Sequence, residues 1–314
     1  DLKKGALETD IKSLKKAARK TIGPELEKRI QIVIDTGLVE LKNDSKIYWN
    51  NATIGKLIPG KDYLSPNIEL LVDDMLEQNQ KNKLINFLEK WLKNKISSVL
   101  KSLYDLKDLK DKNSSIKALA YQLYENNGVL KRDNVSEYLK KLDQNDRKIL
   151  RDLGVKFGRY HVFLFKLIKP EPVSLRTLLW KNYNQKYFNL QPPTFGLNFL
   201  NDDKIQNINF MLLCGFEKFN NFYIRIDILE RLFMQIINSD TKDIKEIKII
   251  PEMLNLLGCK KDDFKQLLRA MSYKILEKDN EVFFKYNPKK KVRPQNKKNV
   301  KENPFGVLKN LNLN

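Results

Sequence analysis

Histidine, cysteine and long apolar runs are scarce in this sequence of 314 residues, and each scarcity excludes a class of function. His161 is the only histidine, so histidine-rich metal sites and histidine-dependent hydrolysis are poorly supported, and we expect a hydrogen-bonded, semi-buried side chain. Cys214 and Cys259 are far apart and flanked by apolar residues, which predicts buried free thiols in a reducing compartment. No window approaches the ~20 apolar residues that cross a bilayer, and no signal peptide is recognisable, so we expect a cytoplasmic protein.

The sequence also lacks the motifs of a nucleotide-driven motor. A P-loop needs Gly-Lys followed by Ser or Thr to cradle phosphates, but the two candidates read GKL at 55–57 and GKD at 60–62. There is no DExH or DEAD box. The Asp pairs at 73–74 and 262–263 lie in helical patterns, where capping explains them better than metal binding. We therefore expect no catalytic residue, no metal site and no cofactor of the chain's own.

Positive charge is abundant. Lys and Arg number 59 against 39 Asp and Glu, a formal net charge of +20. Such an excess attracts polyanions, nucleic acid before anionic membrane. An AT-rich genome also inflates Lys, but the same codon bias raises Glu and so does not explain the asymmetry. We expect RNA or DNA as a partner and no membrane association.

The hydrophobic periodicity predicts a mixed α+β fold that is mostly helical. We expect a helical accessory domain over residues 1–182 with a small antiparallel sheet near 29–58, an aromatic linker over 183–200, a winged-helix-like unit over 201–287 and a basic disordered tail with an apolar tip over 288–314. The first few residues of the stretch 29–58 are also compatible with the preceding helix, which starts near Gly23-Pro24. Within the first domain, helices are predicted at 65–76, 84–103, 115–126, 134–151 and 173–182.

The winged-helix-like unit is predicted from turn and helix signals. A hairpin turns at Asn220-Asn221, a helix follows from about Asp227, and another ends at Gly258. A further helix from Asp262 and two alternating strands around residues 279–280 complete the pattern. The same arrangement also occurs in protein-docking modules, and periodicity does not choose between the two uses.

Three groups of residues are candidate nucleic-acid contacts. The first lies in the glycine- and aromatic-rich segment 152–172 and is composed of Lys156, Arg159, Tyr160 and Lys169, where stacking and phosphate neutralisation compete with simple core packing as explanations. The second lies on the expected second helix and wing: Lys265, Arg269, Lys274 and Lys285. The third is the polycationic stretch 288–301, which has no acidic residue and carries Lys289, Lys290, Lys291, Arg293, Lys297 and Lys298.

Several strings together resemble the C-terminal region of alphaproteobacterial helicases related to the mitochondrial RNA helicase Suv3. The most specific is LRDLGVKFGRYHVFLFKLIKPEPVSLRTLLW at 150–180, in which Phe165 stands where the family tends to have proline. Others follow in family order: RIDILERL at 225–232, PEMLNLLGCKKDDFKQLLRAMSYK at 251–274 and NPFGVLKNLNL at 303–313. Upstream, KKAARKTIGPELEKRI and KIYWNNATIGKLIPGKDYLSPNIELL are also similar to that family.

The resemblance implies a superfamily 2 DExH-box helicase whose motor domains use ATP and Mg²⁺ and precede this region, acting on it in cis or in trans. The chain would then be its nucleic-acid-binding accessory part, inactive as an ATP hydrolase alone. Two alternatives stay open. The chain is a stand-alone nucleic-acid-binding protein, or its winged unit and apolar tip form a docking platform for a nuclease.

Overall fold

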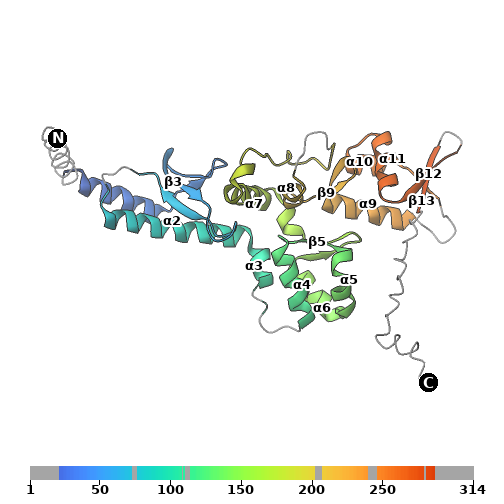
Figure 1. The fold of residues 1–314 in the computed structure, drawn as a ribbon, viewed down its shortest axis with the longest axis horizontal. Helices are drawn as coiled ribbons and strands as arrows, with labels where there is room; N and C mark the ends of the chain where they lie inside the picture. The colour runs from blue at the N-terminus through green and yellow to red at the C-terminus, as the bar shows by residue number, and fades with distance from the viewer. Residues whose placement is uncertain are drawn as a thin grey trace, which may run out of the picture.

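The computed structural model describes residues 21–72, 76–107, 109, 114–201, 207–239, 246–278 and 281–286. Within these ranges the fold is mixed α+β and mostly helical, with small antiparallel sheets, which confirms the predicted fold class. Figure 1 shows an elongated arrangement in which β3 and α2 lie toward one end and β12 and β13 toward the other. No helix of the described part is long and apolar enough to cross a membrane.

The N-terminal part is an antiparallel sheet packed against one long helix. Its strands pair in chain order: β1 (Glu40–Leu41), β2 (Lys46–Trp49), β3 (Ala52–Ile58) and β4 (Asn67–Leu70). Asn50 and Asn51 connect β2 to β3 with positive φ, because asparagine tolerates the left-handed backbone of a tight hairpin. Helix α2 (Gln78–Val99) confirms the predicted amphipathic helix, since it buries Leu84, Leu88, Leu92 and Ile96 at four-residue spacing.

The structure decides one alternative and corrects one prediction for this part. Residues 29–36, for which both the sheet and a continuation of the preceding helix were open, belong to a helix over 21–36. Their buried residues Ile30 and Val33 are three positions apart, which fits one face of a helix and not a strand. Residues 67–70 of the helix predicted at 65–76 form β4, because their main chain pairs with β3 to complete the sheet. Pro66 misled the prediction, since proline suits a strand entry as well as a first helical turn.

Residues 114–164, called unit A, surround a small sheet with helices and follow α3 (Lys101–Lys107). Asp143 breaks the single helix predicted over 134–151, because its carboxylate accepts the main-chain N–H of Asp146 at 2.7 Å and starts a new helix. In the three-stranded sheet of this unit, the strand that comes last in the chain lies between the other two. The elements are α4 (Ser114–Glu125), β5 (Val129–Lys131), η1 (Arg132–Val135), α5 (Ser136–Lys141), α6 (Gln144–Asp152), β6 (Val155–Phe157) and β7 (His161–Leu164).

Residues 165–225, apart from 202–206, form unit B with the same strand order. The predicted hairpin at residues 220–221 is confirmed, and the end of the predicted linker 183–200 supplies a third strand. Trp180 stacks on Tyr187 with ring centroids 5.4 Å apart, so this segment folds back on α7. The elements are η2 (Phe165–Ile168), α7 (Pro170–Tyr183), η3 (Gln185–Tyr187), β8 (Phe199–Asn201), α8 (Ile208–Leu213), β9 (Phe216–Phe219) and β10 (Phe222–Arg225).

Residues 226–286, apart from 240–245 and 279–280, form unit C. Gly258 ends α10 in the left-handed conformation, as predicted. The helices and the hairpin occur in the predicted order, whereas the winged-helix assignment and the domain boundaries remain predictions. The elements are α9 (Ile226–Ser239), β11 (Ile247–Lys248), α10 (Pro251–Leu257), α11 (Lys261–Ala270), β12 (Tyr273–Lys278) and β13 (Glu281–Tyr286), with β13 central in the sheet.

A fully buried arginine connects units A and B. Arg176 of α7 has no exposed surface, and its guanidinium donates to the main-chain carbonyls of Asn127 at 2.8 Å, Leu167 at 2.6 Å and Leu213 at 3.0 Å. Burial lowers the pKa of this guanidinium. Because three carbonyls from separate segments depend on one side chain, Arg176 fixes how α4, η2 and α8 meet.

Candidate nucleic-acid interface

A groove of about 640 Å³ lies where the β6–β7 turn, the β9–β10 hairpin and unit C meet. Among the residues that line it are five aromatic side chains and two cations, which we call the aromatic groove: Tyr160, Phe219, Phe233, Tyr273, Tyr286, Arg159 and Lys285. Three of these, Arg159, Tyr160 and Lys285, were candidate contacts in the sequence. The fold therefore brings together residues that are more than a hundred positions apart.

The rings of the aromatic groove support one another edge to face. Tyr160 meets Phe233 at a centroid distance of 5.3 Å and an interplanar angle of 84°, and Phe219 lies 6.4 Å away on another side. Tyr286 contacts Tyr273 at 5.5 Å and keeps 60% of its surface exposed. The Arg159 guanidinium carbon lies 5.6 Å from the Phe233 ring centre. The groove thus combines exposed aromatic surface with positive charge.

A buried carboxylate holds the β6–β7 turn at the groove. Glu230 of α9 accepts the main-chain N–H groups of Arg159, of Tyr160 at 2.9 Å and of His161 at 2.9 Å. Successive main-chain donors form a concave site for an anion, and a carboxylate strengthens each hydrogen bond. Gly158 leaves room for this carboxylate, since a Cβ at that position would overlap it. Glu230 therefore places Tyr160 at the groove without touching the groove itself.

His161 connects units A, B and C through two carboxylates. Its Nε2 lies 3.2 Å from Glu217 Oε2 and its Nδ1 lies 3.4 Å from Glu230 Oε1, with 2% of the side chain exposed. Lys131 pairs with the other oxygen of Glu217 at 2.6 Å. Burial opposes a charge on His161, but the hydrogen bonds and charges of the two carboxylates prevail and raise its pKa. The expected hydrogen-bonded histidine is confirmed, and it is more deeply buried than predicted.

We expect this cluster to weaken at alkaline pH. The pKa of folded His161 is raised above 6.5, so its contribution to stability is complete below the unfolded-state value and is lost as pH rises through the folded-state value. The lowered pKa of Glu217 acts oppositely, and its contribution is lost in acid, below the usual 4.5. Thermal melting of wild type and His161→Gln over a pH series measures this. The alkaline loss should be specific to wild type, and equal losses in both proteins would contradict the assignment.

The other candidate contacts lie outside the aromatic groove. Lys156 is exposed on β6 and Lys274 is exposed on β12. On α11, Arg269 is exposed, whereas Lys265 pairs with Glu277 at 2.7 Å. The six cations of the predicted tail, Lys289, Lys290, Lys291, Arg293, Lys297 and Lys298, lie outside the described residues.

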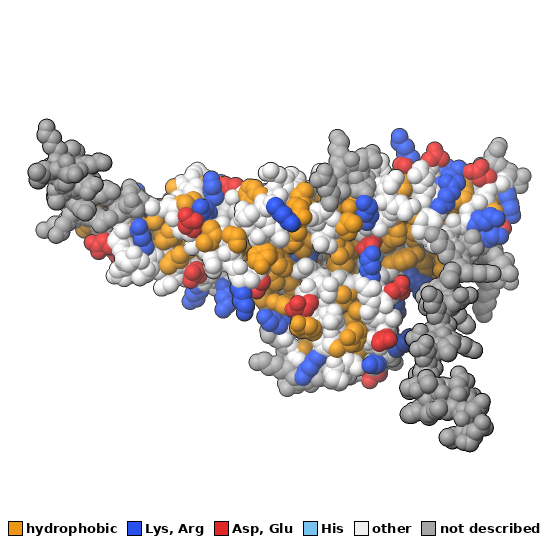
Figure 2. All heavy atoms as spheres, viewed as in Figure 1, with side chains coloured by type: hydrophobic (Ala, Val, Ile, Leu, Met, Phe, Trp, Pro, Cys, Tyr) orange, Lys and Arg blue, Asp and Glu red, His pale blue; other side chains and the backbone are white. Residues whose placement is uncertain are grey.

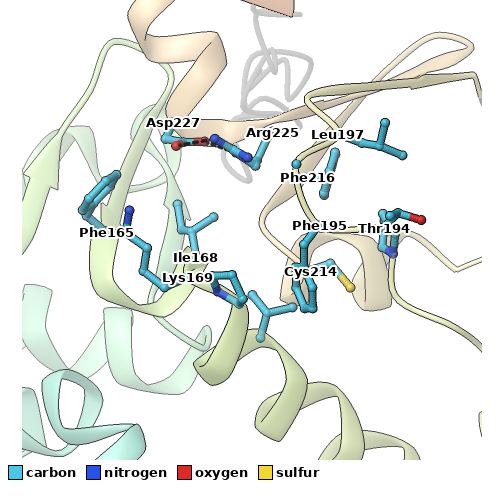
Figure 3. A pocket seen from close by; sticks show the side chains of 14 residues that line it. Phe165, Ile168, Lys169, Thr194, Phe195, Leu197, Cys214, Phe216, Arg225 and Asp227 are labelled. Atoms are coloured by element: carbon cyan, nitrogen blue, oxygen red, sulfur yellow. Dashed lines mark hydrogen bonds and ion pairs between the residues drawn. The ribbon is translucent and has the colours of Figure 1, made fainter. Parts of the chain in front are cut away.

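Lys169 belongs to a separate, smaller cavity of about 120 Å³ between unit B's first helix and its sheet (Figure 3). Its ammonium lies 4.4 Å from the Phe165 ring centre, which is an intramolecular use of this charge. Arg225 and Asp227, also at this cavity, form a bidentate ion pair at 2.7 and 3.1 Å. Cys214 borders it as a free, buried thiol, and burial raises its pKa to about 12. Lys169 does not line the aromatic groove, so we do not include it in the interface.

Cys259 is also a free thiol, but it is half-buried and not fully buried as the sequence predicted. It directly precedes Lys260, the N-cap residue of α11.

Comparison with known proteins found no matching family model, no matching curated protein and no matching solved structure.

Proposed function

We propose that the chain binds single-stranded nucleic acid in the aromatic groove, as the accessory region of an ATP-dependent RNA or DNA helicase. The observation that carries this proposal is the meeting of five aromatic rings, of which Tyr286 is 60% exposed, with Arg159 and Lys285 in one groove. Bases stack on aromatic rings whatever their sequence, while cations follow the phosphates. The net charge of +20 adds a long-range attraction for the same ligand.

The helicase part of the proposal rests on the sequence strings that resemble the Suv3-like family. Unwinding needs a motor that hydrolyses ATP with Mg²⁺, and this chain carries neither a P-loop nor a DExH box. Its role would be to hold the strand that leaves the motor. Binding with little sequence preference suits that task, because a helicase translocates along the strand whatever its bases.

A protein-docking role is the second candidate. It is favoured by the apolar rim that α9 adds to the groove: Ile237 is 46% exposed and its neighbour Met234 is 55% exposed. Figure 2 shows hydrophobic side chains gathering in this region of the displayed face. Large exposed apolar patches mark protein interaction sites, for example for a nuclease partner.

Fluorescence anisotropy with a labelled single-stranded oligonucleotide tests the groove. Loss of one stacking platform costs about 1–3 kcal/mol, so Tyr286→Ala should raise Kd by about 5- to 100-fold. Tyr121→Ala is the matched control, because Tyr121 of α4 is also 60% exposed but lies outside the groove. Equal affinities of the two variants would refute binding in the groove, and an absence of binding by wild type would leave the docking role.

A further inference from the structure

Units A, B and C are three copies of one local architecture. In each, the residue just before the second strand in chain order has a positive φ: Gly154, Gly215 and Ser272. The position three residues later pairs with a fully buried residue of the central strand, which pairs in turn with the first strand. These trios are Phe157–Val162–Leu130, Lys218–Tyr223–Leu200 and Ile275–Phe284–Ile247. The shared register allows side chains of the three units to be compared position by position.

This comparison aligns cations of units A and C. Counted from the left-handed residue, the positions seven and three residues before it and two after it hold Arg147, Arg151 and Lys156 in unit A. The same positions hold Lys265, Arg269 and Lys274 in unit C. In unit B they hold Ile208, Leu212 and Glu217. The first two positions are four residues apart and therefore share one helix face, beside the strand that carries the third.

The cations at the last two positions are not neutralised by a carboxylate of the described part. Arg151, Lys156, Arg269 and Lys274 are all exposed, and none forms a salt bridge with another residue of the described part. At the first position Arg147 donates to the Leu139 carbonyl at 2.8 Å and so connects α6 to the preceding helix α5. In unit B the corresponding Glu217 instead joins His161 and Lys131 in the contact between units.

In unit A the cations gather around one ring. The guanidinium carbons of Arg147 and Arg151 lie 6.0 and 5.8 Å from the Phe157 ring centre. Such contacts hold long side chains in place through attraction between the cation and the ring. These two arginines therefore hold ordered positive charge beside β6. Lys156 precedes Phe157 on this edge strand and is exposed on the opposite face of β6, so cations border the strand on both sides.

We propose that this edge of unit A, which we call the α6–β6 face, is a second nucleic-acid site. It binds the phosphate backbone of a duplex and is equivalent to the corresponding edge of unit C, the α11–β12 face. The proposal rests on the proposed function in that the ligand is nucleic acid, but not on the aromatic groove. Cations without base-reading partners bind phosphates whatever the sequence. Figure 1 shows α6 and α11 on opposite edges of the molecule, so the two faces bind separate segments. Unit B contributes no such face.

The test compares paired charge reversals in the full chain, with a short labelled DNA duplex titrated at several salt concentrations. Arg151→Glu/Lys156→Glu and Arg269→Glu/Lys274→Glu should each reduce the slope of log K against log salt by about 1.8, because each lost phosphate contact removes about 0.9. Lys90→Glu/Lys93→Glu on α2 is the control, with the same charge change on an exposed helix face. The control should change the slope less than either of the other pairs.

Three outcomes overturn the second site. A unit A variant that matches the α2 control shows that only total charge matters. If the slope of log K against log salt falls only in Arg269→Glu/Lys274→Glu, all duplex contacts lie on unit C. Binding of phosphatidylserine vesicles by the α6–β6 face, without duplex binding, assigns it to membranes. An unchanged melting temperature of Arg151→Gln/Lys156→Gln shows that the two side chains are not needed for folding. If Tyr286→Ala keeps the wild-type salt dependence of duplex binding, this site is distinct from the aromatic groove.

Discussion

Replacing Arg176 with methionine should destabilise the protein more than any surface change described above. The substitution keeps much of the apolar stem but leaves the carbonyls of Asn127, Leu167 and Leu213 without their donor. An unsatisfied buried polar group costs about 1–3 kcal/mol, so we expect a loss of at least about 3 kcal/mol. For a chain of this size that is a fall of roughly 5 °C in melting temperature.

Arg176→Lys provides the graded control, because its ammonium reaches fewer of the carbonyls and so should fall between wild type and Arg176→Met. Differential scanning calorimetry measures all three proteins. If Arg176→Met had the same melting temperature as wild type, water would replace the guanidinium without loss of stability.

The second large effect is expected from Glu230→Ala. It removes the acceptor from three consecutive main-chain N–H groups and one of the two partners of His161, a loss of about 3 kcal/mol or more. It also frees the turn that carries Tyr160 and Arg159, so binding of single-stranded nucleic acid should weaken together with stability. Melting and anisotropy on the same sample measure both effects.

Two further variants separate the causes. Glu230→Gln keeps one carbonyl acceptor and should lose less of both properties. Gly158→Ala brings a Cβ into the space of the Glu230 carboxylate and should resemble Glu230→Ala, although Glu230 itself is unchanged. If Gly158→Ala behaved like wild type, the close approach of turn and carboxylate would not be needed.

Local patterns of the sequence were sufficient for most elements. The stripe on α2, the left-handed Gly258 and the hairpin at residues 220–221 each depend on neighbours a few positions away. The prediction failed where one local sequence signal fits both a helix and a strand. Pro66 begins β4 because β3 offers an edge to pair with, and that edge is not visible in the residues around Pro66.

The candidate site was less accessible to sequence reasoning. The sequence predicts Arg159 and Tyr160 as candidate contacts, but Phe219 and Tyr286, which complete the groove, come from distant hairpins. One missed residue did carry a signal. Glu230 lies three positions before Phe233 and four after Ile226, on the apolar face of α9, where an unpaired carboxylate would be costly. Its partners, main-chain groups of the β6–β7 turn, have no signature in the sequence.

The most direct test of nucleic-acid binding in the aromatic groove is photo-crosslinking. The full chain is irradiated with a single-stranded oligonucleotide that carries photoreactive pyrimidines, and the linked peptides are mapped by mass spectrometry. Crosslinks should concentrate on the peptides of Tyr160, Phe219 and Tyr286, and Tyr286→Ala should remove those in its own strand. Crosslinks distributed over the chain without enrichment at these three peptides would contradict the account.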